Sequence, residues 1–393
     1  MSNRVKKGVK SWRAVVTIDG VSKTKILNVR CEPDSDTGKR KALRLAAEWE
    51  QELVKAGGLR RSDEDLVDYC HTTIETRMAT GQIESSTYRG YRTSLNYIAG
   101  YFSGERKRTV SEVTTSDIEG FVVWMADSEG LCSNTRKKTY NVLDSCLRHA
   151  VESRKIPWNP CDPVRAPKQT KTPPNALTEE SRVSFVRHMD ELELTPEVMG
   201  VWIAYWTGMR RGEICGLKWS DVELRGEAVA RVADAIGVGV GGTYEKDTKA
   251  HNTRLVPLPP QLVRLLKERR AAMLEQCLAA GIGFSADLYV CGEVDGRYLN
   301  PPRLTKWFTQ HRSEWNLMGT QGKPVVLHGL RHTYATLAVR ALNIKTAQSV
   351  LGHKDIQMTM DYADTTREDV KLARAPMADA LSVPESAEVR KIG

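Results

Sequence analysis

The proline-rich stretch at residues 159–178 is the feature that most constrains how this chain can fold. Its sequence, NPCDPVRAPKQTKTPPNALT, contains five prolines and shows no apolar period. Proline lacks a backbone N–H and interrupts helices and central strands, so no regular element can run through this stretch. We therefore expect separate folded regions in the chain of 393 residues, joined by an extended linker at 166–177.

The region before the linker, residues 62–165, has the apolar spacing of helices. The stretches 62–78, 114–129 and 133–154 each open with polar residues suited to capping a helix start. In the stretch 85–102, tyrosines and aliphatic residues recur on one stripe of a helix. These patterns predict a compact domain of four helices joined by short loops.

Positive charge is concentrated at the start of the chain. Residues 1–45 carry twelve Lys or Arg and four Asp or Glu, a net +8 of the +9 for the whole chain. The stretch SWRAVVTIDGVSKTKILNVR predicts a β-hairpin around an Asp-Gly turn, and TGKRKALRLAAEWEQELVKAGG predicts a helix closed by glycines. A folded basic module at residues 1–60 fits this pattern better than a disordered tail, and its charge favours nucleic acid as a partner.

Basic residues of this module and of the fourth predicted helix are the candidate DNA contacts. They are Lys6, Lys7, Lys10, Arg13, Lys23, Lys25, Arg136, Lys137 and Lys138. The last three form the first turn of a helix, where a solvated surface explains the charge equally well.

Residues 178–375 form a third predicted region, with helices first, then strands, then helices, and residues 376–393 form a tail. The predicted fold class is therefore multidomain, mainly α with small β. It comprises a β-hairpin or sheet plus helix module, a four-helix domain and a mixed α+β domain.

Several classes of protein are disfavoured by the composition. The eight cysteines form no CxxC or Cys/His cluster, so we expect reduced thiols and no metal site. No apolar run approaches the roughly 18 residues of a membrane span, and the basic start leads into no apolar signal region, which favours the cytoplasm. The stretch GVGVGG at 237–242 leads into a strand-like segment, so it fails the helix context of a dinucleotide site and no cofactor is expected.

Three clusters in the third region contain the candidate chemistry. TGMRRGE places Arg210 and Glu213 where a buried helix meets a turn, and HGLRHTYAT places His328 and Arg331 three residues apart. That spacing brings two side chains to one face of a helix. The third cluster, LGHKDIQMTMDY, sets His353 nine residues before Tyr362. Each cluster taken alone fits a structural role as well as a functional one.

Together the clusters offer two arginines, two histidines and a tyrosine. Arginine binds phosphate oxygens bidentately and stays protonated, so two arginines can stabilise a pentacoordinate phosphorus without a metal. A tyrosine phenol is a competent nucleophile when its proton is removed during attack. A general acid for the departing sugar oxygen would lie in TYEKDTKAHNTRLVPLP, where spacing alone favours neither Lys246 nor Lys249.

These motifs resemble those of the tyrosine site-specific recombinases, or phage-type integrases. TGMRRGE is similar to the first arginine box, HGLRHTYAT to the His-x-x-Arg box, and LGHKDIQMTMDY to the box that carries the nucleophile. TKAHNTRLVPL resembles the lysine hairpin of the family, which selects Lys249. The likeness is strong over residues 178–375, moderate over 62–165, and general in residues 1–60, which are similar in type to arm-binding modules.

The resemblance implies roles for six residues, and all six positions match. Arg210 and Arg331 would hold the scissile phosphate, Lys249 would protonate the leaving 5′ oxygen, and Tyr362 would attack to give a 3′-phosphotyrosine. His328 and His353 would bind the phosphate or assist proton transfer. The implied partners are double-stranded DNA at core and arm sites and three further copies in a tetramer that exchanges strands through a Holliday junction. A DNA-bending protein and a directionality factor are the accessory partners of such a reaction.

Two alternatives stand beside this interpretation: a relaxing enzyme of the type IB topoisomerase kind, and a non-catalytic DNA-binding protein. A structural expectation also follows from the third cluster. Nine residues of straight helix make about two and a half turns, which would leave His353 and Tyr362 on opposite sides. If both meet one phosphate, the chain must leave the helix between them, around QMTM, with His353 on a turn opened by Gly352.

Overall fold

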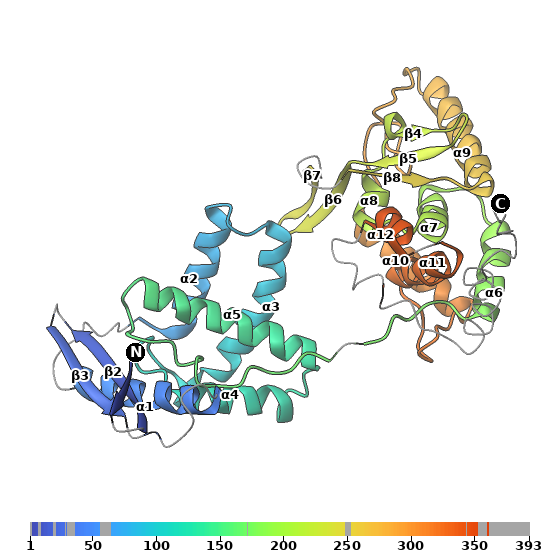
Figure 1. Cartoon of the computed structure of the whole chain (residues 1–393). Helices are drawn as coiled ribbons and strands as arrows, with labels where there is room; N and C mark the ends of the chain where they lie inside the picture. The colour runs from blue at the N-terminus through green and yellow to red at the C-terminus, as the bar shows by residue number, and fades with distance from the viewer. Residues whose placement is uncertain are drawn as a thin grey trace, which may run out of the picture. The chain divides into compact units, whose positions relative to one another are not determined.

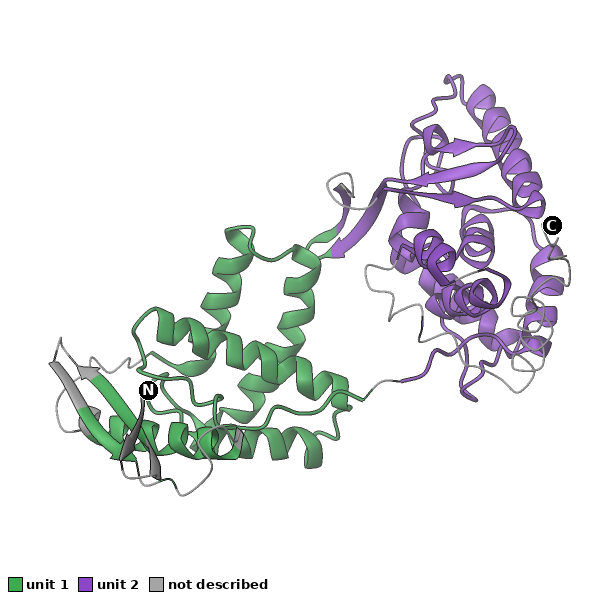
Figure 2. Cartoon of the chain, in the orientation of Figure 1, with its two compact units in different colours: residues 1–171, 239–242 green, residues 172–238, 243–393 purple. Residues whose placement is uncertain are grey.

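The computed structural model describes most of the chain and divides it into two compact units. The described residues are 2–6, 9–18, 21–27, 29, 36–55, 64–170, 172–247, 253–342, 344–352 and 360. The units are Met1–Lys171 with Gly239–Gly242, and Thr172–Val238 with Thr243–Gly393 (Figure 2). The elements are mainly helical with small sheets, so the predicted fold class is confirmed (Figure 1).

A basic three-stranded sheet begins the first unit. Its strands are β1 (Ser2–Lys6), β2 (Val9–Ile18) and β3 (Val21–Leu27), followed by helix α1 (Asp36–Lys55). Strands β2 and β3 form the predicted hairpin, with Ile18 paired to Val21, while the Asp-Gly pair itself lies outside the described residues. Strand β1 was not predicted, because its five residues, SNRVK, show no clear strand pattern. Ala14 and Leu27 of the sheet and Ala42 and Ala46 of α1 share a small core.

The four predicted helices of the first unit are confirmed. They are α2 (Leu66–Ala79), α3 (Ser85–Tyr101), α4 (Thr115–Asp127) and α5 (Ser133–Glu152). Asp65 accepts the first free N–H groups of α2, and Thr114 forms a reciprocal capping box with Asp117 at the start of α4. Helix α3 packs against the other three around a core that includes Leu95, Phe121 and Leu143.

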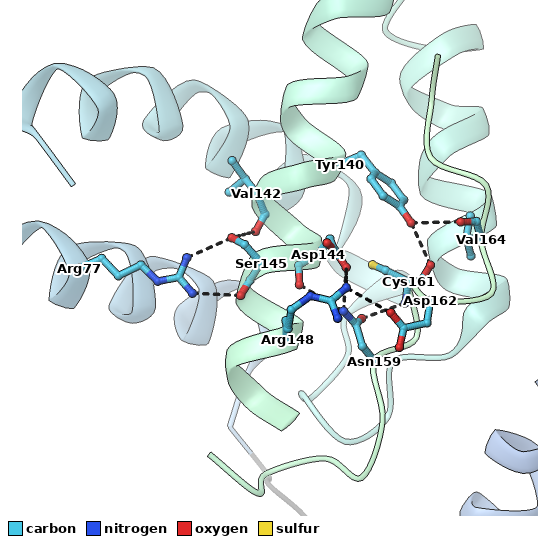
Figure 3. Close-up of polar contacts among 10 residues, drawn as sticks. All are labelled: Arg77, Tyr140, Val142, Asp144, Ser145, Arg148, Asn159, Cys161, Asp162 and Val164. Carbon is cyan, nitrogen blue, oxygen red and sulfur yellow. Dashed lines mark hydrogen bonds and ion pairs between the residues drawn. The ribbon is translucent and has the colours of Figure 1, made fainter. Parts of the chain in front are cut away.

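Residues 159–164, at the start of the proline-rich stretch, are bound to α5 (Figure 3). The hydroxyl of Tyr140 donates to the carbonyl of Cys161 at 2.9 Å, and Asn159 Nδ2 donates to Asp144 Oδ1 at 2.7 Å. Arg148 Nη2 binds the carboxylates of Asp144 at 3.0 Å and Asp162 at 3.2 Å. This part of the stretch is therefore held by the helical unit, although it contains neither helix nor strand.

The second unit contains helices, then strands, then helices, in the predicted order. Its elements are α6 (Glu179–Asp190), α7 (Pro196–Thr207), α8 (Arg211–Gly216), β4 (Val222–Glu223), β5 (Val229–Val232), β6 (Asp234–Gly239), β7 (Gly242–Asp247), β8 (Arg254–Pro257), α9 (Pro260–Ala279), α10 (Pro301–Glu314), α11 (Leu327–Ala341) and α12 (Ile344–Leu351). Strands β4, β5 and β8 form one sheet in that order, and β6 pairs with β7. The glycine-rich stretch at 237–242 therefore joins two strands, as expected, and starts no helix.

Helix α7 lies at the centre of the second unit, and its burial explains its sequence. It packs against α8, α9, α10 and α11, and its segment VMGVWIAY is buried on every side. Thr195 caps its start and Pro196 occupies the first turn, while Gly208 ends it with a φ of 62°. That left-handed turn brings the chain directly to Arg210.

Two further observations concern the described residues. No helix in the described part of the chain is long and apolar enough to cross a membrane. The seven cysteines among the described residues are all free, and no group of metal-binding side chains gathers there.

Candidate functional site

Arg210 occupies the turn between α7 and α8, and Glu213 holds it there. Arg210 is the N-cap of α8, and its backbone N–H donates to Glu213 Oε2 at 2.7 Å. Its Nη1 donates to Glu213 Oε1 at 3.0 Å. Glu213 thus acts both as the ion-pair partner of Arg210 and as part of the capping box that starts α8. Figure 1 shows α8 beside the end of α7.

A second arginine, Arg254, also binds Glu213 and was missed from the sequence. Arg254 opens β8 and donates from Nη1 to Oε1 at 3.0 Å and from Nη2 to Oε2 at 2.7 Å. Burial alone would raise the pKa of Glu213, but the hydrogen bonds and charge of Arg254, helped by Arg210, lower it instead. A buried acid beside one arginine was visible in the sequence; the second arginine arrives from a distant strand.

Helix α11 contributes His328 and Arg331, with the helical spacing that was predicted. Arg331 is only 3% exposed. Its Nη1 donates to the carbonyl of Gly208 at 2.7 Å, and its Nη2 donates to the carbonyl of Leu351 at 2.7 Å. Arg331 therefore connects the end of α7 to the end of α12.

The last turn of α12 is the point where the arginines converge. Three successive carbonyls, those of Val350, Leu351 and Gly352, accept hydrogen bonds from three different arginines. The donors are Arg254 Nε at 3.0 Å, Arg331 Nη2 at 2.7 Å and Arg210 Nη2 at 3.3 Å, respectively. Cations at the carbonyl end of a helix satisfy its unpaired acceptors and complement its dipole. The two predicted arginines are thus brought together at the start of the third sequence cluster.

The histidines of α11 lie close to the site arginines, with His328 exposed and His332 half-buried. Burial, Arg331 and Arg210 lower the pKa of His328. Burial, His328 and Arg331 lower the pKa of His332 to about 4. The two rings meet edge to face with centroids 4.8 Å apart. Both imidazoles are therefore neutral at pH 7, and His328 can donate or accept a proton beside the arginines.

A pocket of about 450 Å³ opens next to Arg210 and His328. Its lining comes from α7, α8, α10 and the start of α11: Ala204, Met209, Arg210, Arg211, Gly212, Ile214, Thr305, Val326, Leu327 and His328. The side chain of Arg210 is 42% exposed, whereas that of Arg254 is 10% exposed. Of these two, Arg210 is therefore the arginine that can offer its guanidinium to an incoming anion.

Three predicted site residues, Lys249, His353 and Tyr362, lie outside the described residues. The rival lysine, Lys246, lies on β7. Helix α12 ends at Leu351, and Gly352 follows with a φ of 64°. The predicted turn at Gly352 is thus observed. The predicted interruption of the helix between residues 353 and 362 falls on a stretch that is almost wholly outside the described residues.

The basic residues of the N-terminal module do not all share one face of the sheet. Lys25 lies on the α1 side, 5.5 Å above the ring of Trp49 and 3.9 Å from Glu52. Arg13 alternates with the buried Ala14 and so points to the other side. Of the other candidates, Lys6, Lys10 and Lys23 belong to strands β1, β2 and β3, and Lys7 is outside the described residues.

The basic turn at the start of α5 is partly exposed. Lys138 is exposed, and Arg136 and Lys137 are half-buried. The ammonium of Lys137 lies 5.8 Å above the ring of Tyr140. This arrangement is open to an anionic partner and also to solvent, so the role of the turn stays a prediction.

The fold and the site define a class of protein before any relative is considered. Within the second unit, Arg210, Arg254 and Arg331 gather at the end of α12, and His328 lies on the same helix as Arg331. Arginine and imidazole side chains are the groups that phosphoryl-transfer sites use to bind a phosphodiester and to move a proton.

Comparisons with known proteins agree with a site that acts on a phosphodiester. The phage integrase family matches residues 175–369, and the phage integrase SAM-like domain matches residues 65–167. A tyrosine recombinase XerC-like protein of Caldanaerobacter subterraneus subsp. tengcongensis is 27% identical over 380 residues, covering 91% of this chain and 93% of the relative. The chain belongs to the phage integrase family of tyrosine recombinases, enzymes that cleave and rejoin DNA.

Solved structures show the same fold. The Tn1549 transposon integrase in complex with a circular intermediate DNA has a TM-score of 0.63 at 20% identity, covering 81% of this chain and 99% of that one. A lambda integrase tetramer bound to a Holliday junction has a TM-score of 0.57 at 17% identity, covering 90% of this chain and 95% of that one.

Proposed function

We propose that this protein is a site-specific integrase, which inserts or excises a mobile element by breaking and rejoining DNA at Tyr362. The observation that carries the proposal is the meeting of Arg210 and Arg331 at the end of α12, with His328 close enough for both arginines to lower its pKa. In the sequence, α12 is followed by the segment that contains His353 and Tyr362. Two arginines next to the start of that segment support the proposal that they bind the phosphate attacked by Tyr362.

The proposed reaction is a transesterification that conserves the phosphodiester bond. The phenolic oxygen of Tyr362 attacks phosphorus, a Tyr–O–P bond forms, and the bond from phosphorus to the 5′ oxygen breaks. The phenol proton passes to a base, for which His328 and His353 are the candidates, and Lys249 supplies a proton to the leaving oxygen. Arg210 and Arg331 stabilise the added charge at phosphorus. Religation is the reverse of these steps, and so no nucleotide is consumed.

The proposed organisation assigns one role to each part of the chain. Residues 1–60 form an arm-type DNA-binding domain, 62–165 a helical core-binding domain, and 178–375 the catalytic domain. Residues 166–177 link the last two, and 376–393 form a C-terminal tail. Support comes from the folded basic module at the N-terminus and from the two family matches, which meet near the linker.

The proposed partners are double-stranded DNA and other copies of the chain. The core site and separate arm sites would be bound by one tetramer, with strands exchanged in pairs through a Holliday junction. The Tn1549 integrase was solved in complex with a circular intermediate DNA, and a lambda integrase tetramer was solved bound to a Holliday junction. The shared fold supports similar partners for this chain. A DNA-bending protein and a directionality factor would act with it, in the cytoplasm on the bacterial nucleoid.

The decisive test of the nucleophile is the Tyr362→Phe variant. We expect it to bind the core DNA site normally but to form no covalent complex with a nicked suicide substrate, because the ring lacks the attacking oxygen. Denaturing gel electrophoresis of the protein–DNA mixture measures the complex.

Tyr334→Phe is the matched control. Its ring lies in the same unit, against Gly208, and burial raises the pKa of this tyrosine. It should capture DNA like the wild type. Capture that persists in Tyr362→Phe and disappears in Tyr334→Phe would place the nucleophile on α11.

Recombination and relaxation distinguish the integrase from a relaxing enzyme. An integrase joins two cognate duplexes into recombinant products. Relaxation of any supercoiled plasmid, without preference for a site and without recombinants, would instead identify a topoisomerase-like activity.

A further inference from the structure

Arg254 makes contacts that connect two parts of the site. The residue lies at the start of β8, and none of the six predicted roles belongs to it. Its two terminal nitrogens bind both oxygens of Glu213 on α8, at 3.0 and 2.7 Å. Its Nε donates to the carbonyl of Val350 on α12, at 3.0 Å. One guanidinium thus joins the helix that carries Arg210 to the helix that leads to Tyr362.

We propose that Arg254 is a positioning residue for DNA cleavage. It fixes Glu213, which in turn orients the guanidinium of Arg210, and it holds the last turn of α12. The inference rests on the proposed function, because the two groups it aligns are the phosphate-binding arginine and the segment of the nucleophile. Arg254 acts through these groups and does not itself contact DNA.

Burial supports an indirect role. The side chains of Arg254 and Glu213 are 10% and 9% exposed, and all the donor nitrogens of Arg254 already have partners within the protein. Such a pair is weakly screened by solvent, and its geometry is well defined by three hydrogen bonds. Arg210 shares Glu213 but is much more exposed, so the phosphate meets Arg210 and not Arg254.

The shape of the α12 end matches this arginine. Gly352 has a φ of 64°, and a Cβ built there would lie 2.8 Å from Cδ and 3.0 Å from Nε of Arg254. The side chain therefore packs directly under the turn where the chain leaves α12. Only a glycine allows both the left-handed turn and this approach.

The guanidinium is required because its donors point in different directions. Two of them meet a carboxylate on one side while Nε reaches a carbonyl on another. A lysine ammonium has a single nitrogen, so it can keep the ion pair with Glu213 but cannot hold α12 at the same time. Arg254→Lys therefore keeps the positive charge next to Glu213 and removes the hydrogen bond to α12.

The test compares the full-length Arg254→Lys variant with wild type. We expect covalent capture at saturating suicide DNA to be slower by on the order of 10- to 100-fold, since small displacements of reacting groups carry costs of that size. DNA affinity and melting temperature should stay close to wild type, because the ion pair remains. Hydrogen exchange of the last turn of α12 should become faster, while exchange in α9 stays unchanged.

Arg231→Lys is the matched control. Arg231 lies on β5 opposite Leu255 of β8, and its side chain pairs with the buried Asp221 at 2.6 Å. It should leave capture and α12 exchange unchanged. A combined Arg254→Lys and Glu213→Gln variant should capture no more slowly than the slower single variant, because both changes act through one contact.

The outcomes separate this inference from the proposed function. Capture within twofold of wild type in Arg254→Lys would overturn the positioning role, and so would a loss of DNA affinity that matches the loss of capture. If the wild-type chain captures no DNA at all, the proposed function fails. In that case hydrogen exchange alone would test whether Arg254 holds α12. Unchanged exchange of the last turn of α12 in Arg254→Lys would overturn that role.

Discussion

The two histidines of α11 show how burial among arginines tunes single residues. His328 is exposed and His332 is half-buried, yet for both histidines desolvation and the charge of Arg331 lower the pKa and disfavour the protonated form. In the proposed reaction, a neutral His328 could take the proton of the attacking phenol. The arginines that would bind the phosphate are also the charges that keep this imidazole deprotonated.

The lowered pKa of His332 predicts a pH-dependent contribution to stability. Its pKa is about 4 in the folded protein against 6.5 ordinarily, so between these values the unfolded chain binds the extra proton. The contribution of His332 to the stability of the folded protein is therefore fully present above pH 6.5 and is lost as the pH falls toward 4. We expect His332→Gln, which cannot be protonated, to reduce the fall in melting temperature between pH 7 and pH 5. Equal falls in both proteins would contradict the prediction.

At the residue scale the sequence predicts Arg210, His328 and Arg331 as site residues, because their motifs are local. It could not identify Arg254, which lies 41 positions from Glu213 along the chain. An arginine at the start of a short strand has no local signal for a buried carboxylate. That pairing follows only from the way β8 and α8 pack in the second unit.

At the scale of elements, Arg331 joins the end of α7 to the end of α12 through hydrogen bonds. The carbonyl of Gly208 and that of Leu351 bind the same guanidinium, so the left-handed turn at Gly208 helps to place the arginine. The helices themselves were predictable from caps and apolar spacing. Their junction was not, because it depends on a contact between residues 123 positions apart.

Gly208→Ala should destabilise the protein more than an ordinary glycine substitution. The left-handed φ of 62° costs an alanine about 1 kcal/mol, and a Cβ there would lie 2.6 Å from Cδ1 of Tyr334. Overpacking of this kind adds about 1–3 kcal/mol. Denaturant unfolding of the purified protein measures the difference.

Gly226→Ala is the control for backbone strain alone. Gly226 has a φ of 58° and no atom within 4 Å of its Cβ position, so only the cost of about 1 kcal/mol should appear. Equal losses of stability in the two variants would mean that the ring of Tyr334 moves aside freely.

At the scale of the whole molecule, the N-terminal module is a small folded body with its own core. The sheet β1–β3 and helix α1 bury a few alanines and aliphatic side chains, which is a separate cluster from that of α2–α5. A module with its own core is expected to add a function without being required for the fold of the rest.

Deletion of residues 1–60 should therefore leave cleavage at the core site intact and abolish binding to separate flanking sites. The reason is that the basic sheet is lost while the helical and catalytic regions keep their cores. Footprinting on DNA that contains both kinds of site measures the two effects together. Protection of the flanking DNA that survives the deletion would show that the module is not an arm binder.

The sequence by itself determined the parts of this protein that depend on neighbours along the chain. Helix starts, the pairing of β2 with β3 and the helical spacing of His328 and Arg331 each depend on residues that are close together in the sequence. The tertiary structure alone decided that three arginines from a helix cap, a strand and a buried helix meet at successive carbonyls of α12. Arg210 and Gly352 lie 142 positions apart, and only the packing of α11 and β8 against α12, and of α7 against α11, brings such distant groups together.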